Sequence, residues 1–234
     1  NIIVSATKIR DLYDGKNIQS KTLLEAFQEH NERARSLVGV DFSASTCVRY
    51  ETTMKHVKDF MKVKYKLNDI NLNEIKYSFV DDFEYYMKTT RGCNHNSTLK
   101  YTKNFRKIIN LAVKNEWLER DPFMKYTCKY KVVERGFLTS EELAVLESKE
   151  INNARLDQVR DVFVFACYTG LAYADVEKLS PENIIKGVDG ELWISIHREK
   201  TNTKSTIPLL AKPIQILEKY NERFDSTLLP VLSN

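Results

Sequence analysis

The chain has 234 residues, of which 42% are hydrophobic and 29% charged, with only 7 glycines and 5 prolines. This composition is typical of a globular protein with one large or two small domains, and it excludes a disordered or fibrous chain. A net charge of +4 is compatible with a polyanionic partner but does not require one. No apolar run reaches about 18 residues, which predicts that no helix crosses a membrane. The scattered cysteines predict neither a disulfide framework nor a metal site.

The ends of the chain are expected to belong to a longer protein. The chain begins at Asn1 rather than at a methionine, and it ends at Asn234 directly after an apolar stretch. Residues 1–20 are polar and mixed, and we interpret them as a linker or an exposed helix.

Residues 21–122 carry four amphipathic patterns separated by short polar breaks. Apolar residues recur every three or four positions in each pattern, so each predicts a helix with one buried face. Ser43 or Ser45 is expected to cap the second helix, and Asn96 or Ser97 the fourth. Short connections between four helices predict a compact bundle. The expected helices span residues 22–37, 43–65, 74–88 and 96–116.

Two of these helices carry lysines at helical spacing, away from their apolar faces. Lysines grouped on one face neutralise phosphates and so bind nucleic acid. A solvated helix face is the other interpretation, and the pattern alone does not choose between them. The second helix contributes Lys55, Lys58 and Lys62, and the fourth contributes Lys100, Lys103 and Lys107.

Asp121-Pro122 ends the bundle region, and residues 123–136 are interpreted as an interdomain linker because they are polar, basic and without clear period. A second domain is expected over 137–234. Its first helix has a clear start signal, since Thr139 and Glu142 form a capping box. The later elements are expected to be an apolar helix over 156–168, a short helix over 172–179, a three-stranded meander over 183–209 and a helix from Pro213 to about Arg223.

Two segments of the second domain carry candidate chemistry, CYTGLAYADVEKLS (167–180) and REKTNTKSTIPLL (198–210). The second reads as a strand, a polar turn and a returning strand, which would hold Lys200 at a hairpin tip. A lysine fixed in this way can donate a proton to a leaving oxygen. Taken by itself, the hairpin is better interpreted as an ordinary charged turn.

Together these segments resemble the tyrosine recombinases of the phage-integrase type, and among them the integrases of Bacteroides-type conjugative and mobilisable elements. That family shows T-G-L-R-x-x-E-L, a β-hairpin lysine and a V-P-L strand. This chain has T-G-L-A-Y-A-D-V, R-E-K-T and T-I-P-L-L in the same order. Asp121-Pro122-Phe123 and Phe137-Leu138-Thr139 also match the usual hinge between the two domains. The resemblance extends from about Lys21 to Asn234.

The resemblance implies a mainly α fold with a small antiparallel sheet. A four-helix, SAM-like core-binding bundle would be followed by a truncated mixed α/β catalytic domain, and residues 1–20 would trail from an arm-site DNA-binding domain. It also implies site-specific strand exchange on double-stranded DNA through a 3′-phosphotyrosyl intermediate, with no cofactor and no metal. Such a protein is expected to be cytoplasmic, monomeric when free and tetrameric on DNA.

The site residues implied by the resemblance are few. Lys200 stands at the position of the hairpin general acid, and Asp175 takes the place of the acidic residue that braces the site. Lys204 is the second choice for the acid and is also expected to bind DNA. Ala172 occupies the position of the first catalytic arginine and carries no charge. The second arginine, the histidine and the nucleophilic tyrosine have no counterpart in the chain, and Tyr173 is interpreted as a packing residue. The fragment is therefore expected to bind DNA but not to cleave it.

Two other functions stay open. A non-catalytic DNA-binding or architectural protein would keep the fold without the chemistry, and Ala172 favours it. An all-helical protein-interaction module would use the lysines only as a solvated face. DNA affinity that falls steeply with salt would exclude the second alternative.

Overall fold

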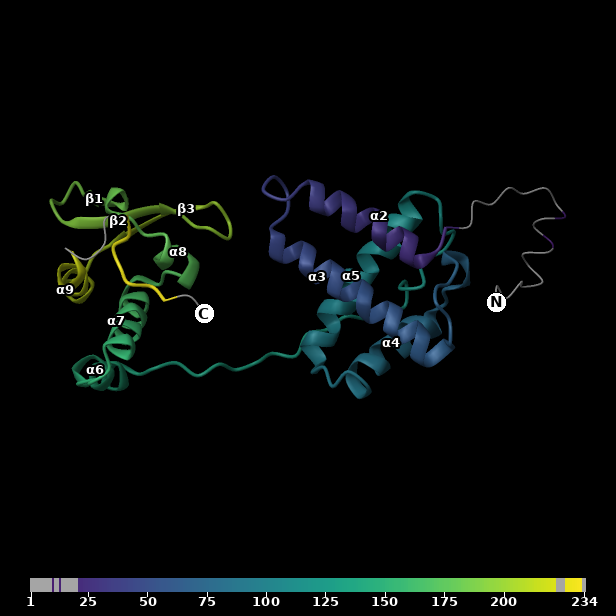
Figure 1. Cartoon of the computed structure of the whole chain (residues 1–234), viewed down its shortest axis with the longest axis horizontal. Coiled ribbons are helices and arrows are strands. Elements are labelled where there is room, and N and C mark those ends of the chain that lie inside the picture. Colours follow the sequence, from purple (N-terminus) through teal and green to yellow (C-terminus); the bar gives the residue numbers. More distant parts are fainter. Residues whose placement is uncertain (1–9, 11–12, 14–20, 222–225, 233–234) are drawn as a thin grey trace. The chain divides into compact units, whose positions relative to one another are not determined.

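A computed structural model describes residues 10, 13, 21–221 and 226–232. The expected tail over 1–20 and the expected end of the last helix near Arg223 therefore fall largely outside the described residues. The chain divides after Val133 into two compact units (Figure 1), and each is described by itself. Among the described residues, no helix is both long enough and apolar enough to cross a membrane.

The first unit is the expected bundle of four helices. Side-chain oxygens of Thr22, Ser43 and Asn94 accept backbone N–H groups at the starts of three of them. Asn94 caps the fourth helix in place of the expected Asn96 or Ser97, because its carboxamide accepts the N–H of Ser97 at 2.8 Å. The helices are α2 (Leu23–Ser36), α3 (Ala44–Phe60), α4 (Tyr77–Thr89) and α5 (His95–Lys114).

Two of these helices differ at an end from the sequence expectation. α4 begins three residues late because Leu72–Glu74 form a separate 3-10 turn. α3 ends as an α-helix at Phe60 and continues as one π-helical turn, Met61–Tyr65, which Lys66 closes in the left-handed conformation. An extra residue in such a turn shifts the side chains that follow it around the helix axis.

Aromatic side chains fill the core of the first unit. The ring of Phe105 lies 5.1 Å from that of Phe123 and 5.6 Å from that of Phe83. Phe123 is fully buried, and Tyr126, also buried, donates its hydroxyl to Glu84. Residues 123–126 therefore pack into the first unit, whereas the sequence interpretation placed all of 123–136 in a linker. Aromatic burial holds this part of the segment despite its basic composition.

The second unit contains four helices and one three-stranded antiparallel sheet among its described residues. The strands lie in the order β1-β2-β3, as a meander requires, with Trp193 opposite Pro208 and His197 opposite Lys204. The N–H of Leu209 extends the ladder by donating to Leu192 at 2.9 Å. The elements are α6 (Ser140–Ser148), α7 (Ala154–Thr169), α8 (Tyr173–Glu177), β1 (Ile184–Lys186), β2 (Leu192–His197), β3 (Lys204–Pro208) and α9 (Ala211–Tyr220). The expected fold class, mainly α with a small antiparallel sheet, is confirmed.

α7 presents a different face to the core from the one its sequence suggested. Val164 and Phe165 are buried, but Val159 and Phe163, which lie within the expected apolar helix, are 48% and 46% exposed. Residues 162–168 are apolar at every position, so periodicity in this half of the helix does not identify the inward face. A buried aspartate, Asp161, lies on the inward side instead.

Candidate nucleic-acid interface

The turn after α7 is shaped by a single glycine. Gly170 has φ 64° and ψ 16°, the left-handed conformation in which a helix commonly ends, and its N–H donates to Ala166 at 2.8 Å. Leu171 is buried and anchors the turn. Ala172 follows as the N-cap of α8, with an exposed methyl group and no side-chain capping bond. The position expected for a catalytic arginine is thus open to solvent and uncharged.

Asp175 holds the base of the β2–β3 hairpin against this turn. Its side chain is buried, and its Oδ1 atom accepts the backbone N–H of Glu199 at 2.8 Å. Lys178, which follows α8, adds a more exposed ion pair to the carboxylate of Glu199 at 2.8 Å. The side chain of Asp175 therefore joins α8 to the hairpin, and its role in bracing a catalytic site stays a prediction.

Arg198 reaches from the hairpin to the glycine turn. Its Nη2 atom donates to the carbonyl oxygen of Gly170 at 2.7 Å. Its Nε atom is buried without a hydrogen-bond partner among the described residues, and the nearest oxygen of Asp175 is 3.8 Å away. The guanidinium group thus lies at the turn that Ala172 leaves uncharged, with one donor unused.

Sequence reasoning did not single out Arg198. It stands two positions before Lys200 in the quoted R-E-K-T segment, and this proximity was the available signal. Its contact to Gly170 crosses 28 positions of sequence and depends on how the hairpin meets α7. A one-dimensional motif does not contain that geometry.

The two candidate general acids occupy different places in the hairpin. Lys200 is exposed in the turn, which closes through the N–H of Arg198 donating to Thr203 at 2.9 Å. Asn202 takes a positive φ of 52° to complete this turn. Lys204 is the first residue of β3, where it pairs with His197. Of these two lysines, only Lys200 lies at the tip of the β2–β3 hairpin.

α5 of the first unit packs along one side of α3. Asn104 of α5 donates to the hydroxyl oxygen of Thr53 at 3.1 Å. One turn further along α3, the ring of His56 meets that of Tyr101 with centroids 4.7 Å apart. These contacts define which side of α3 is covered by α5.

The lysines of α3 lie on the other side of that helix. Arg35 of α2 forms an ion pair with Glu51, so this side of α3 is turned toward α2. Residues seven apart share a helix face, which puts Lys58 on the side of Glu51, with Lys55 next to it. Lys62 lies beyond α3, in the π-helical turn Met61–Tyr65. The structure therefore does not bring the α3 lysines and the α5 lysines into one surface.

The α5 lysines differ among themselves. Lys107 donates to the hydroxyl oxygen of Tyr50 at 2.7 Å, so its ammonium group helps to hold α5 to α3. Lys103 lies 4.3 Å above the ring centroid of Tyr130, a cation–π contact. Lys100 is exposed. Of the three α5 lysines predicted to bind phosphate, Lys107 is thus bonded to α3, whereas Lys100 and Lys103 are not.

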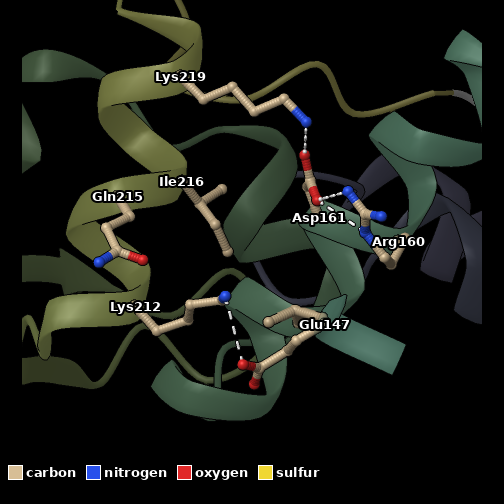
Figure 2. A pocket seen from close by; sticks show the side chains of 8 residues that line it. Glu147, Arg160, Asp161, Lys212, Gln215, Ile216 and Lys219 are labelled. Atoms are coloured by element: carbon tan, nitrogen blue, oxygen red, sulfur yellow. Dashed lines mark hydrogen bonds and ion pairs between the residues drawn. The ribbon is translucent and has the colours of Figure 1, made fainter. Parts of the chain in front are cut away.

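A second charged cluster lies between α7 and α9, around a cavity of about 180 Å³. Figure 2 shows that each cation lining it has an acidic partner: Lys212 pairs with Glu147 at 3.3 Å, and Lys219 with Asp161 at 2.6 Å. Arg160 also donates to Asp161, at 2.7 Å. The charges of the cavity wall are therefore largely compensated within the unit.

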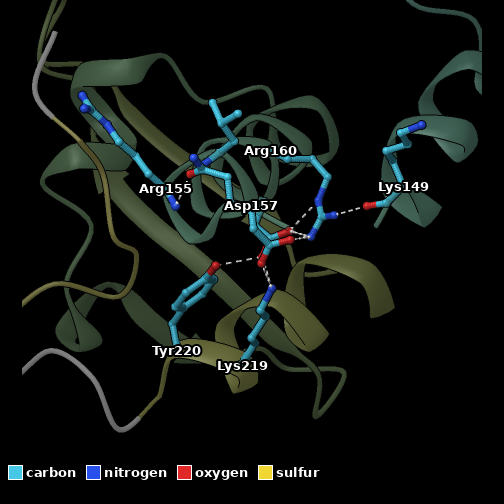
Figure 3. Close-up of polar contacts among 9 residues, drawn as sticks. Lys149, Arg155, Asp157, Arg160, Lys219 and Tyr220 are labelled. Atoms are coloured by element: carbon cyan, nitrogen blue, oxygen red, sulfur yellow. Dashed lines mark hydrogen bonds and ion pairs between the residues drawn. The ribbon is translucent and has the colours of Figure 1, made fainter. Parts of the chain in front are cut away.

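This cluster joins α7 to α9. Figure 3 shows Arg160 bonded to the carbonyl of Lys149 at 2.5 Å and Lys219 bonded to Asp157 at 2.6 Å. Burial by itself would raise the pKa of Asp161, but hydrogen bonds from Lys219, Arg160 and Tyr220 outweigh it and lower the pKa below its ordinary value. Burial, together with the bond to Asp161, raises the pKa of Tyr220 to about 12.

Tyr173, beside the motif, has an occupied hydroxyl. It donates to the carbonyl of Leu232 at 2.9 Å. Partial burial and the neighbouring Glu177 carboxylate raise the pKa of this phenol, which disfavours the phenolate that a nucleophile would need. These contacts agree with its interpretation as a packing residue.

Comparison with known proteins identifies the architecture. Residues 22–132 match the family described as the phage integrase SAM-like domain. A lambda integrase tetramer bound to a Holliday junction superposes over 98% of this chain with a TM-score of 0.73, at 17% identity. This is the integrase fold. A Tn1549 transposon integrase in complex with a circular intermediate DNA has the same fold, with a TM-score of 0.66 and 12% identity over 92% of this chain.

The integrase fold is not present here at its full length. The chain spans 65% of the lambda integrase and 70% of the Tn1549 integrase to which it was compared. No curated protein sequence matches it. At this level of identity the likeness to solved structures concerns the fold.

Proposed function

We propose that these residues belong to a site-specific DNA recombinase of a mobile element, similar to the integrases of Bacteroides-type elements. It would act in the cytoplasm, bind duplex DNA as a tetramer, and exchange strands through a 3′-phosphotyrosyl intermediate in the complete protein. The fold, the SAM-like match and the hairpin site together support this proposal. We assign no nucleophile among the tyrosines of this chain.

The observation that carries the proposal is the position of Arg198. Its guanidinium group lies at the Gly170 turn, two residues from Ala172, with Nε buried and unbonded among the described residues. The side chain of Arg198 is 40% exposed, so part of it is open to a ligand although Nε is not. A DNA phosphate is a suitable ligand, because arginine binds phosphate with a planar fork of donors. We therefore assign to Arg198 the charge that Ala172 does not supply.

The remaining roles follow from the hairpin. In the cleavage step a tyrosine oxygen forms a bond to phosphorus while the bond from phosphorus to the 5′-oxygen breaks. Arg198 stabilises the negative charge that develops on the phosphoryl oxygens. The ammonium group of Lys200 gives its proton to the departing 5′-oxygen. Asp175 touches neither reacting atom, and it positions the hairpin by accepting the N–H of Glu199.

Three variants of the complete recombinase separate these roles. The substrate is a duplex that the recombinase has itself selected from a random pool. Lys200→Ala should slow cleavage of normal DNA about 10²–10³-fold, yet spare a 5′-bridging phosphorothiolate, whose thiolate leaves without a proton. Arg198→Ala should slow cleavage of both substrates by about 10²–10³-fold, because phosphoryl charge develops in either case. Lys186→Ala, an exposed lysine of β1 in the same sheet, is the matched control and should change neither. Equal loss on both substrates for Lys200→Ala would refute its role as the acid.

Ala172 also favours a second candidate, a DNA-binding or architectural protein that has lost the chemistry. That protein would bind duplex DNA with the same surface but would show no cleavage on either substrate. Wild-type cleavage in the assay above would exclude it.

A further inference from the structure

Two side chains in the first turn of α5 hold the backbone that follows the first core. The carboxamide of Asn96 donates to the carbonyl oxygen of Lys131 at 2.8 Å and accepts the N–H of the same residue at 2.9 Å. The Nε2 atom of His95 lies 2.9 Å from the carbonyl oxygen of Lys129. Since a carbonyl oxygen only accepts, the ring carries its proton on Nε2 and donates. We call these three hydrogen bonds the α5 clamp.

The chain beyond Lys131 has no such attachment. Residues 132–138 are all exposed and form neither helix nor strand. None of these seven residues takes part in a hydrogen bond or an ion pair with any described residue. The division of the chain into two units falls within this stretch, after Val133. Attachment resumes at Thr139, whose hydroxyl accepts the N–H of Glu142 at 3.2 Å as α6 begins.

The clamp acts through backbone polar groups rather than through burial. Lys129, Tyr130 and Lys131 are all exposed, so little apolar area holds them in place. Asn96 satisfies both backbone groups of one residue, as a neighbouring strand would. Each of these bonds contributes little net free energy, so the clamp can open locally while the rest of the first unit stays folded.

We propose that the α5 clamp determines where the tether between the two units begins, so that only residues 132–138 move freely. Asn96 is the positioning residue, because it supplies two of the three bonds. A flexible stretch of seven residues has a root-mean-square span of about 15 Å, against about 19 Å for the twelve residues 127–138 that would be free without the clamp. This inference goes beyond the proposed function and does not depend on it.

Trypsin tests the clamp directly. It cleaves after lysine and arginine, and the carbonyl oxygen of the bond to be cut must enter its oxyanion hole. The clamp occupies the carbonyls of Lys129 and Lys131, whereas that of Arg135 accepts no hydrogen bond from any described residue. Brief digestion of the folded 234-residue chain, followed by mass spectrometry, should therefore show cleavage after Arg135 first. Each rate is divided by the rate at the same bond in a synthetic peptide of residues 123–140, and equal ratios at all three bonds would overturn the clamp.

Asn96→Ala tests the positioning role. It should speed cleavage after Lys131 about tenfold and leave cleavage after Arg135 unchanged, because two hydrogen bonds each worth about a factor of three are lost from the closed state. Alanine is a good helix former, so α5 itself is kept. Asn110→Ala, another exposed asparagine of α5, is the control and should change neither rate. An unchanged rate after Lys131, or an equal rise after Arg135, would overturn the role of Asn96.

Hydrogen exchange separates opening of the clamp from unfolding of the first unit. The amide of Lys131 should exchange about tenfold faster in Asn96→Ala, because exchange and proteolysis both follow the population of the open form. The amides of Ile108 and Ile109, which are fully buried in the first core, should keep their wild-type rates. Faster exchange at these isoleucines as well would show that the variant loosens the whole unit, and would overturn the clamp as a local device.

Discussion

Single residues in this protein derive their roles from the partners that the fold gives them. Asp161 and Asp175 are both buried aspartates of the second unit, with side chains 9% and 4% exposed. Asp161 accepts from Arg160, Lys219 and Tyr220 and joins two helices. Asp175 accepts one backbone N–H and meets Arg198 only at 3.8 Å. Asp161 thus joins α7 to α9, whereas Asp175 leaves part of the Arg198 guanidinium group available to another acceptor.

Asp161→Asn is expected to lower the free energy of unfolding of the second unit at pH 7 by about 2–4 kcal/mol, because the largely buried Arg160 and the half-exposed Lys219 lose their charged acceptor. The pKa of Asp161 is lowered on folding, so its ionised form stabilises the unit above about pH 4. That stabilisation disappears as pH falls through the folded pKa. Urea denaturation between pH 3 and 7 should therefore show the deficit of the variant shrinking toward acid.

The exposed Glu182→Gln provides the control for this measurement and should keep the wild-type profile. A deficit of Asp161→Asn that stays constant down to pH 3 would show that its carboxylate does not titrate as described.

At this scale the sequence indicated Lys200 and Asp175 but not Arg198. The first two stand at motif positions, and their catalytic roles stay predictions. Arg198 becomes notable only through its contact to Gly170, which requires the hairpin and the helix to be placed in space. For the same reason the sequence grouped Lys107 with Lys100 and Lys103, whereas its ammonium group is bonded to Tyr50.

Among the elements, α7 and its terminal glycine do most to shape the site. The helix ends where Gly170 turns into the left-handed region, and that turn presents the carbonyl that Arg198 binds. A Cβ at this position would meet no neighbouring atom within 4 Å, so only the backbone conformation opposes a larger residue. A larger residue at position 170 is thus opposed by the positive backbone φ and not by a steric clash of its side chain.

Gly170→Ala should lower the free energy of unfolding of the second unit by about 1 kcal/mol, the cost of a left-handed alanine. Gly136→Ala is the matched control, because a Cβ there also meets nothing within 4 Å and no positive φ is imposed. It should be neutral. Chemical denaturation of both variants measures the difference, and equal effects would contradict the conformational argument.

The starts of several helices were predictable, and the inward face of α7 was not. Thr22, Ser43 and Thr139 are short polar residues followed by a helical pattern, a local signal that needs no tertiary information. The second half of α7, residues 162–168, is apolar at every position, so tertiary packing decides which of these residues are buried. Its actual orientation follows the polar junction at Asp161.

The molecule as a whole has two separate main cores, one for each unit. Phe105 is fully buried in the first and Phe165 in the second. Because each core is made from its own segment of chain, each unit has the means to unfold as its own cooperative transition. The sequence could indicate this arrangement through its composition and its turn signals.

Calorimetry of the chain is expected to resolve two transitions. Phe105→Ala should destabilise only the first unit, and Phe165→Ala only the second, each by about 3–5 kcal/mol because a large cavity is left in a packed core. The Asp161→Asn variant should affect the same transition as Phe165→Ala. A single transition that both phenylalanine variants shift together would show that the two units unfold as one.

The register of the sheet has a consequence for how the protein behaves in concentrated solution. Leu209 donates its N–H toward β2, so by alternation the outward positions of β3 are those of Lys204, Thr206 and Pro208. Proline has no N–H to offer, and a lysine at the other end adds charge. Among the described residues, β3 is an edge strand that makes a poor template for intermolecular strand addition. The hairpin that carries Lys200 is thereby protected from aggregation while it stays exposed.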